Sequence, residues 1–98
     1  MEMRDLRNFI KIVQAGSFTK AAEHSFVSQP SLSKSIKRLE EELDVQLLER
    51  TTRFIRLTEE GKVVFEQSKK AINAMDEIQL HLNDLRHIHT GTIKIGIP

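Results

Sequence analysis

The 98-residue sequence predicts a mainly α-helical fold with one small β-hairpin, and three patterns indicate this class. Apolar residues recur at helical spacing in three successive segments of the N-terminal half. Two short apolar runs with a polar connection follow, which is typical of a hairpin. About 30 further residues then contain no proline, which predicts one long helix.

The first helix is expected at about residues 4–15, because its apolar side chains share one helical face. These side chains are Leu6, Phe9, Ile10 and Val13. Gly16 is expected to end the helix, since glycine readily adopts the left-handed conformation at a helix end. Ser17 is expected to cap a short second helix by accepting a hydrogen bond from its first turn.

The third predicted helix has the clearest amphipathic pattern. Ser28 is its expected cap, and Pro30 is tolerated in its first turn. Its buried stripe recurs at i, i+4, i+7 and i+11 and comprises Leu32, Ile36, Leu39 and Leu43. The opposite face is polar or basic almost throughout, and Gln29 leads it at the N-terminal end of the helix.

The hairpin is predicted from the apolar runs at residues 45–48 and 54–57. Thr58 is the expected cap of the long helix that follows, over residues 59–89. Seven positions of this helix are spaced alternately by four and three, which predicts a coiled-coil seam and a partner helix. Ser68 is the polar member, and the apolar members are Val64, Ala71, Met75, Ile78, Leu82 and Leu85.

These elements divide the sequence into three predicted parts. Residues 1–58 are expected to form a compact domain, residues 59–89 a linker helix for dimerisation, and residues 90–98 the start of a further domain. Positions 92–97 alternate isoleucine with polar or small residues, which is a strand pattern. A lone strand is not stable, so we expect it to be the first strand of a second domain, cut off at Pro98.

Composition excludes several classes of site. There are no cysteines, and the four histidines share no convincing ligand face, so no metal site is expected. No nucleophile–base pair or glycine-rich phosphate loop is recognisable, so neither an enzyme nor a cofactor is expected. No apolar run reaches the roughly 20 residues of a membrane span and no signal peptide opens the sequence, which predicts a cytoplasmic protein without a membrane partner.

The net charge of +1 is distributed unevenly. Two runs, residues 28–38 and 50–56, contain bases and no acid, and an acidic block at residues 40–44 separates them. Their bases are Lys34, Lys37 and Arg38 in the first run and Arg50, Arg53 and Arg56 in the second. Local basic patches are expected of a nucleic-acid-binding protein, although solvated helix faces have the same charge pattern.

Taken in order, a helix, a short helix, a tight turn, a helix with a basic face and a hairpin describe a winged helix-turn-helix. One α-helix fits the major groove of double-stranded DNA, so the third helix is the predicted reading helix. Its expected base contacts are Gln29, Pro30, Ser31, Ser33 and Lys34. Arg53, at the tip of the hairpin, is expected to enter a narrow minor groove. Lys37 and Arg38 are better placed for phosphates.

The run from Phe9 to Gly61, which contains AGSFTKAAEHSFVSQPSLSKSIKRLEEELDVQLLERTTRFIRLTEEG, resembles the N-terminal domain of LysR-type transcriptional regulators. The resemblance implies a bacterial, sequence-specific DNA-binding regulator that dimerises through its linker helix on a dyad operator and often forms tetramers. It also implies a small-molecule effector bound by a C-terminal effector-binding domain, of which residues 90–98 would be the truncated start. It assigns base reading to the same positions of the third helix, Gln29, Pro30, Ser31, Ser33 and Lys34, and minor-groove contact to Arg53. It assigns the DNA-backbone contacts to Ser17, Thr19, Lys37 and Thr52, with Ser28, Arg38 and Arg50 as further candidates.

Three positions depart from the usual pattern of that family. Ser25 stands where leucine is usual, so Phe26 is expected to pack under the turn instead. Asp44 stands where glycine is usual, so the turn after the third helix is expected to be reshaped. Leu48 stands where phenylalanine is common, which is a conservative change in a core.

Other interpretations of the same residues are open. The segment 28–30 fits a simple helix start. Arg38 and Arg50 fit a contact with Glu41, Glu49 or a helix end, and the long seam fits packing on its own domain. For function, one alternative is a helical protein-interaction module without DNA binding. Another is a winged-helix regulator of a different family, such as the molybdate-responsive type.

Overall fold

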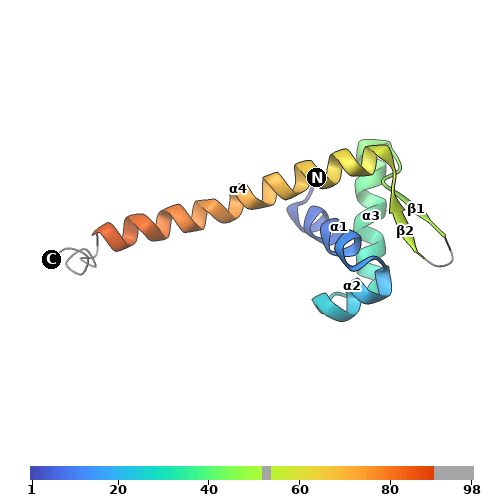
Figure 1. Ribbon diagram of the computed structural model, residues 1–98, viewed down its shortest axis with the longest axis horizontal. Helices are drawn as coiled ribbons and strands as arrows, with labels where there is room; N and C mark the ends of the chain where they lie inside the picture. The colour runs from blue at the N-terminus through green and yellow to red at the C-terminus, as the bar shows by residue number, and fades with distance from the viewer. Residues whose placement is uncertain (52–53, 90–98) are drawn as a thin grey trace.

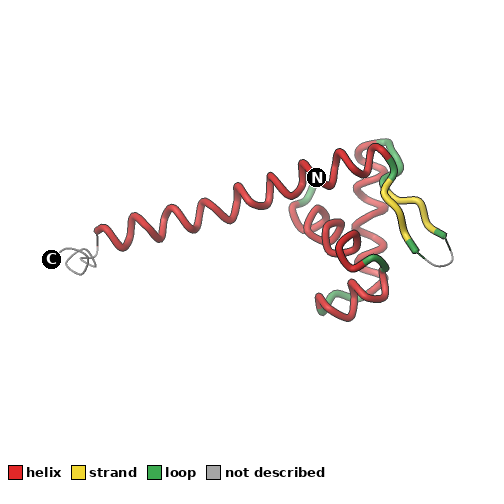
Figure 2. The backbone as a smooth tube through the Cα atoms, in the orientation of Figure 1, coloured by secondary structure: helices red, strands yellow, loops and turns green. Residues whose placement is uncertain are grey.

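The computed structural model describes residues 1–51 and 54–89. Three helices, α1 (Met3–Ala15), α2 (Phe18–Ser25) and α3 (Gln29–Leu43), precede an antiparallel hairpin of β1 (Leu48–Arg50) and β2 (Ile55–Leu57) (Figure 1). The long helix α4 (Glu59–His89) follows. Within residues 1–51 and 54–89, Figure 2 shows helix over most of the chain and strand only in the hairpin. The predicted fold class, a winged helix-turn-helix followed by a long helix, is confirmed.

The core lies between α1 and α3 and is closed by the start of the hairpin and of α4. Phe9 and Ile12 of α1 are fully buried, as are the predicted stripe residues Leu32, Ile36 and Leu39 of α3. Leu43, the last member of that stripe, is half-buried. Removing these side chains from water supplies the main stabilisation of the domain.

The four predicted helix boundaries are confirmed by their hydrogen bonds. Gly16 has φ 84° and donates its N–H to the Ile12 carbonyl. The hydroxyl groups of Ser17, Ser28 and Thr58 accept hydrogen bonds from the N–H groups of the residues three positions later, at 3.0, 3.2 and 2.9 Å. Each side chain thus satisfies one backbone donor that a helix start leaves free.

The first strand begins later than the apolar run 45–48 predicted. Asp44 adopts a left-handed conformation with φ 55° and ends α3. The Glu40 carboxylate then accepts the backbone N–H groups of Leu47 at 2.8 Å and Leu48 at 3.4 Å. The strand β1 begins at Leu48, which faces Leu57, and the Leu47 carbonyl accepts the Thr58 N–H at 3.0 Å just before it.

The expectation that Phe26 packs under the turn between α2 and α3 is wrong. Phe26 is 98% exposed and adopts a left-handed conformation with φ 58°. This conformation reverses the chain after α2 and leaves the ring in solvent. Val27 packs against the core in its place.

Helix α4 leaves the compact domain and extends well beyond α1, with no other described element beside its far end (Figure 1). Its early turns are anchored, because Phe65 packs edge-on against Phe9 with ring centroids 6.3 Å apart. No helix in the described ranges has the apolar length required to cross a membrane. The strand predicted at residues 92–97 lies outside the described residues.

Candidate nucleic-acid interface

The N-terminal half of α3 presents the predicted base-reading residues on the face opposite the core. Gln29, Pro30, Ser31 and Lys34 are exposed, and Ser33 is half-buried. Because Leu32 and Ile36 fix the other face of the same helix in the core, these side chains project from a rigid element. A rigid, exposed helix face is the arrangement that base reading in a major groove requires.

Ser28 and Ser31 form a small hydrogen-bonded unit at the start of α3. The Ser28 hydroxyl accepts the Ser31 N–H at 3.2 Å and donates to the Ser31 hydroxyl oxygen at 2.9 Å. The capping role that the sequence left open for Ser28 is therefore present. Both residues remain exposed beside Gln29, so the unit also orients two hydroxyl groups at the helix end.

Lys34 and Lys37 are the uncompensated bases of α3. Both are exposed, and neither forms an ion pair with any residue that the structure describes. Their ammonium groups therefore remain available for an external anion. DNA phosphates are the anions that flank a helix in the major groove.

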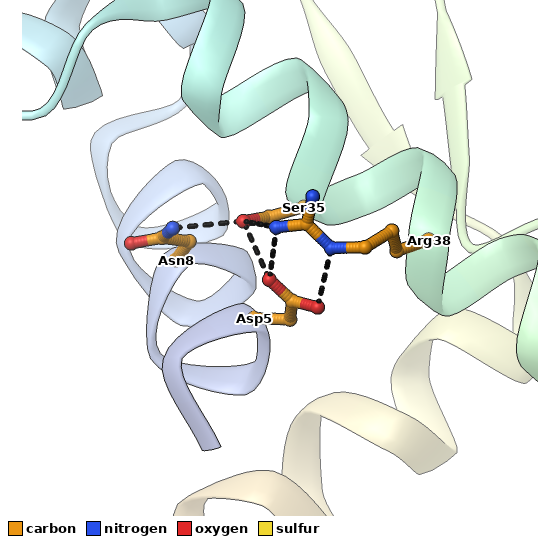
Figure 3. Close-up of polar contacts among 4 residues, drawn as sticks. All are labelled: Asp5, Asn8, Ser35 and Arg38. Atoms are coloured by element: carbon orange, nitrogen blue, oxygen red, sulfur yellow. Dashed lines mark hydrogen bonds and ion pairs between the residues drawn. The ribbon is translucent and has the colours of Figure 1, made fainter. Parts of the chain in front are cut away.

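Arg38 is different, because it binds a buried carboxylate (Figure 3). Its Nε and Nη2 atoms donate to the two carboxylate oxygens of Asp5 at 3.0 and 2.8 Å. Ser35 donates to the same carboxylate at 2.8 Å, and Asn8 donates to the Ser35 hydroxyl at 2.9 Å. These four side chains, which we call the Asp5 network, join α1 to α3 beneath the reading face.

Hydrogen bonding from Arg38 holds the pKa of Asp5 below its ordinary value, although burial opposes this shift. The same hydrogen bond raises the pKa of Arg38. Asp5 is fully buried, whereas the Arg38 side chain is 43% exposed. Arg38 therefore has a structural partner, Asp5, which the sequence analysis did not name. The available signal was that Asp5 and Asn8 share a helical face with the buried Ile12.

Three predicted backbone contacts gather at the start of α2. The guanidinium group of Arg50, at the end of β1, lies 4.5 Å from the centre of the Phe18 ring. Phe18 is flanked by Ser17 and Thr19, and Thr19 is exposed. The cation–π contact thus holds a positive charge next to the helix N-terminus, where the N–H groups and the helix dipole also favour an anion.

The described ends of the wing loop are held by Thr51 and Phe54. The Phe54 carbonyl accepts hydrogen bonds from the Thr51 N–H at 2.9 Å and from the Thr51 hydroxyl at 3.0 Å. The predicted contact residues Thr52 and Arg53 lie outside the described residues.

The predicted dimer seam on α4 is divided into two environments. Val64 and Ala71 are half-buried, and Val64 packs against the core of its own domain. Ser68 is buried. The other four apolar members are exposed by 42 to 57% of their surface: Met75, Ile78, Leu82 and Leu85. A contiguous apolar stripe of this kind is the pattern expected of an association surface, so the role of the seam in dimerisation stays a prediction. Elsewhere in residues 1–51 and 54–89, no three His, Cys, Asp or Glu side chains are arranged to hold a metal ion.

A family model described as "Bacterial regulatory helix-turn-helix protein, lysR family" matches residues 3–62. The nitrogen assimilation regulatory protein nac of Klebsiella aerogenes is 38% identical over 97 residues, which are 99% of this chain and 32% of that protein. The chain therefore spans about a third of the length of the curated relatives it matches.

Two solved structures with similar folds are complexes with DNA. The DNA-binding domain of BenM bound to catB site 1 DNA has a TM-score of 0.82 and 40% sequence identity, and the match covers 87% of this chain and 94% of that one. The CbnR DNA-binding domain in its DNA complex has a TM-score of 0.81 and 33% identity, with 87% and 98% of the two chains covered.

Proposed function

Because the chain belongs to the lysR family of bacterial regulatory helix-turn-helix proteins, we propose that it is the DNA-binding part of a transcription regulator and not an enzyme. The observation that carries the proposal is the reading face of α3, which is exposed, basic and held rigidly from behind by the core and the Asp5 network. The DNA complexes of BenM and CbnR support it. The site of action would be the cytoplasm, where bacterial DNA lies.

In this proposal α3 lies in the major groove. Gln29 and Lys34 carry the most specific hydrogen-bonding groups, because an amide pairs with adenine and an ammonium with guanine. Ser31, Ser33 and the Pro30 ring add hydroxyl and apolar contacts to neighbouring bases. Arg53 would read the width of the adjacent minor groove.

Phosphate contacts would surround the reading helix. Lys37 supplies one charge from α3, and the start of α2 supplies a second anion site with Ser17, Thr19 and Arg50. Ser28 and Thr52 would add hydroxyl donors. Arg38 would contribute through its exposed edge while it remains bound to Asp5.

Dimerisation through the exposed part of the α4 seam would place two reading helices on the two halves of a dyad operator. The half-sites would then lie about 34–36 Å apart or a multiple of this distance, since each domain must face the same side of the duplex. A helical interaction module without DNA binding is not favoured, because it leaves the exposed basic face of α3 without a role.

The test is a titration of the 98-residue chain against an operator selected from a random duplex library and against a random duplex. Gln29→Ala should cost about 1–3 kcal/mol on the operator and leave random-duplex binding unchanged. Lys37→Ala should weaken both alike and reduce the salt slope by about one unit. Absence of binding to any duplex at low salt would reject the function, and equal losses for Gln29→Ala on both duplexes would reject base reading by Gln29.

A further inference from the structure

A cleft between α1 and α3 carries a basic surface that the sequence analysis did not identify. Its volume is about 530 Å³. Arg4, Arg7 and Lys11 line it from α1, and Lys34 and Arg38 line it from α3. No aspartate or glutamate is among its lining residues. We call this hollow the α1–α3 cleft.

Much of the positive charge in the α1–α3 cleft has no internal partner. Arg38 is compensated by Asp5, and Arg7 has only a long contact of 3.5 Å with Asp76, whose side chain is 65% exposed. The other three cations, Arg4, Lys11 and Lys34, form no ion pair with any residue of the described ranges. Gathering such charges in one hollow raises the local potential and favours an anionic ligand.

The cleft is continuous with the reading face. Lys34 and Ser31 belong to both surfaces, so an anion bound at the cleft mouth lies beside the bases that α3 would read. In Figure 1 the wing lies on one side of α3 and α1 lies on the other. A helix about 10–12 Å wide fills a major groove of about 12 Å, so a phosphate backbone runs along each of its sides.

We propose that the α1–α3 cleft binds backbone phosphates of the DNA strand on the side of α3 away from the wing, through Arg4 and Lys11, next to the base-reading Lys34 at the cleft mouth. Helix α1 then contributes to DNA affinity directly, in addition to its role in the core. The inference rests on the proposed function, because it concerns the same DNA. An acidic protein segment fits less well, since α3 bound in the groove already engages Lys34 and Ser31.

The experiment compares the double variant Arg4→Glu/Lys11→Glu with the parent chain. A matched control, Lys62→Glu/Lys70→Glu, makes the same charge change at two exposed positions of α4 outside the cleft. Relative to the control, the cleft variant should bind operator and random duplex about tenfold more weakly and should have a salt slope smaller by about two units, one for each lost phosphate contact. The neutral variant Arg4→Gln/Lys11→Gln should lose the same slope, and circular dichroism verifies that each variant is folded.

Duplexes with uncharged methylphosphonates locate the contact. Replacing the phosphates on the side of α3 away from the wing should weaken the parent and the control, and should leave the neutral variant Arg4→Gln/Lys11→Gln unaffected. Equal affinity and slope for the cleft variant and the control would overturn the inference. Polyglutamate serves as the probe for an acidic protein segment, and a cleft variant that loses polyglutamate binding while its DNA binding is unchanged would also overturn the inference. If the parent and the control bound no duplex, the proposed function itself would have failed.

Discussion

The two halves of α4 have the same heptad spacing but different surroundings. In the proximal half, residues 59–72, Phe65 packs on Phe9, and Ser68 and Ile72 are buried against the compact domain. In the distal half, residues 73–87, the large apolar side chains of the seam are exposed. A regular seam therefore indicates that a surface is apolar, but it does not indicate what covers it.

The difference has an energetic consequence. The proximal half is part of the domain core, so its helix is stabilised by tertiary contacts. The distal half is held by its backbone hydrogen bonds, weak local pairs and the exposed contact of Asp76 with Arg7, and an isolated helix of that length is marginal in water. A second copy of the distal seam would supply the missing apolar contact, as in a coiled coil.

Ile78→Glu should have the largest effect, because it attacks the distal half alone. Two like charges would face each other in an apolar seam and separate the dimer. A monomer can no longer bind the two half-sites at once, so operator binding should weaken by about a hundredfold or more. The compact domain should stay folded because Ile78 is outside its core. Sedimentation and DNA titration measure both effects. Gln79→Glu places the same charge beside the seam and should be neutral. A monomeric Ile78→Glu chain with parental operator affinity would refute the role of the seam.

Gly61→Ala attacks the anchor of the proximal half. A Cβ atom at Gly61 would lie 2.1 Å from the Leu47 carbonyl oxygen, a backbone atom that also accepts the Thr58 N–H. The start of α4 would have to move away from the hairpin, so we expect a loss of about 3 kcal/mol in the free energy of unfolding. Urea unfolding measures this loss. Gln67→Ala, at an exposed position of the same helix, should change little, and equal midpoints for the two variants would contradict the close approach.

Asp5→Asn tests the Asp5 network inside the compact domain. The folded state lowers the pKa of Asp5 from its ordinary value of 3.8, so the carboxylate stabilises the fold above that pH and this stabilisation is lost as pH falls through the lowered value. The variant should be about 2 kcal/mol less stable at pH 7, and the difference from the parent should shrink in acid.

Urea unfolding at pH 7 and in acid measures this pH dependence. Asp76→Asn is the matched control, because its exposed contact with Arg7 should contribute almost nothing at either pH. A difference for Asp5→Asn that stayed constant with pH would show that the carboxylate charge is not what matters.

Phe26→Gly should have the smallest effect and the opposite sign. Phe26 buries almost no surface but adopts a left-handed conformation that costs a non-glycine residue about 1–2 kcal/mol. Glycine would remove this cost, but its greater freedom in the unfolded chain cancels part of the gain. We therefore expect a net stabilisation of about 0.5 kcal/mol. Thermal unfolding measures it. His24→Gly, inside α2, should destabilise, and a destabilised Phe26→Gly chain would indicate that the ring has a role in the fold.

The sequence by itself determined the element order, the helix caps and the face of each helix. Gly16, Ser17, Ser28 and Thr58 were predicted as boundaries because a cap depends on residues within four positions along the chain. The exposed face of α3 was predictable for the same reason, since helical periodicity fixes which side chains lie opposite Leu32 and Ile36. The family motif consists of these same caps and helix faces between Phe9 and Gly61, and the family assignment made from it is confirmed.

Only the tertiary structure decided which distant residues meet. Asp5 and Arg38 are 33 positions apart, and their pairing depends on how α1 crosses α3. The same holds for Arg50 on Phe18 and for the approach of Gly61 to Leu47. It also holds for the point on α4 beyond which the seam loses its cover. Local sequence fixes the faces of helices, but the contacts between those faces depend on packing geometry, which no single segment of the chain encodes.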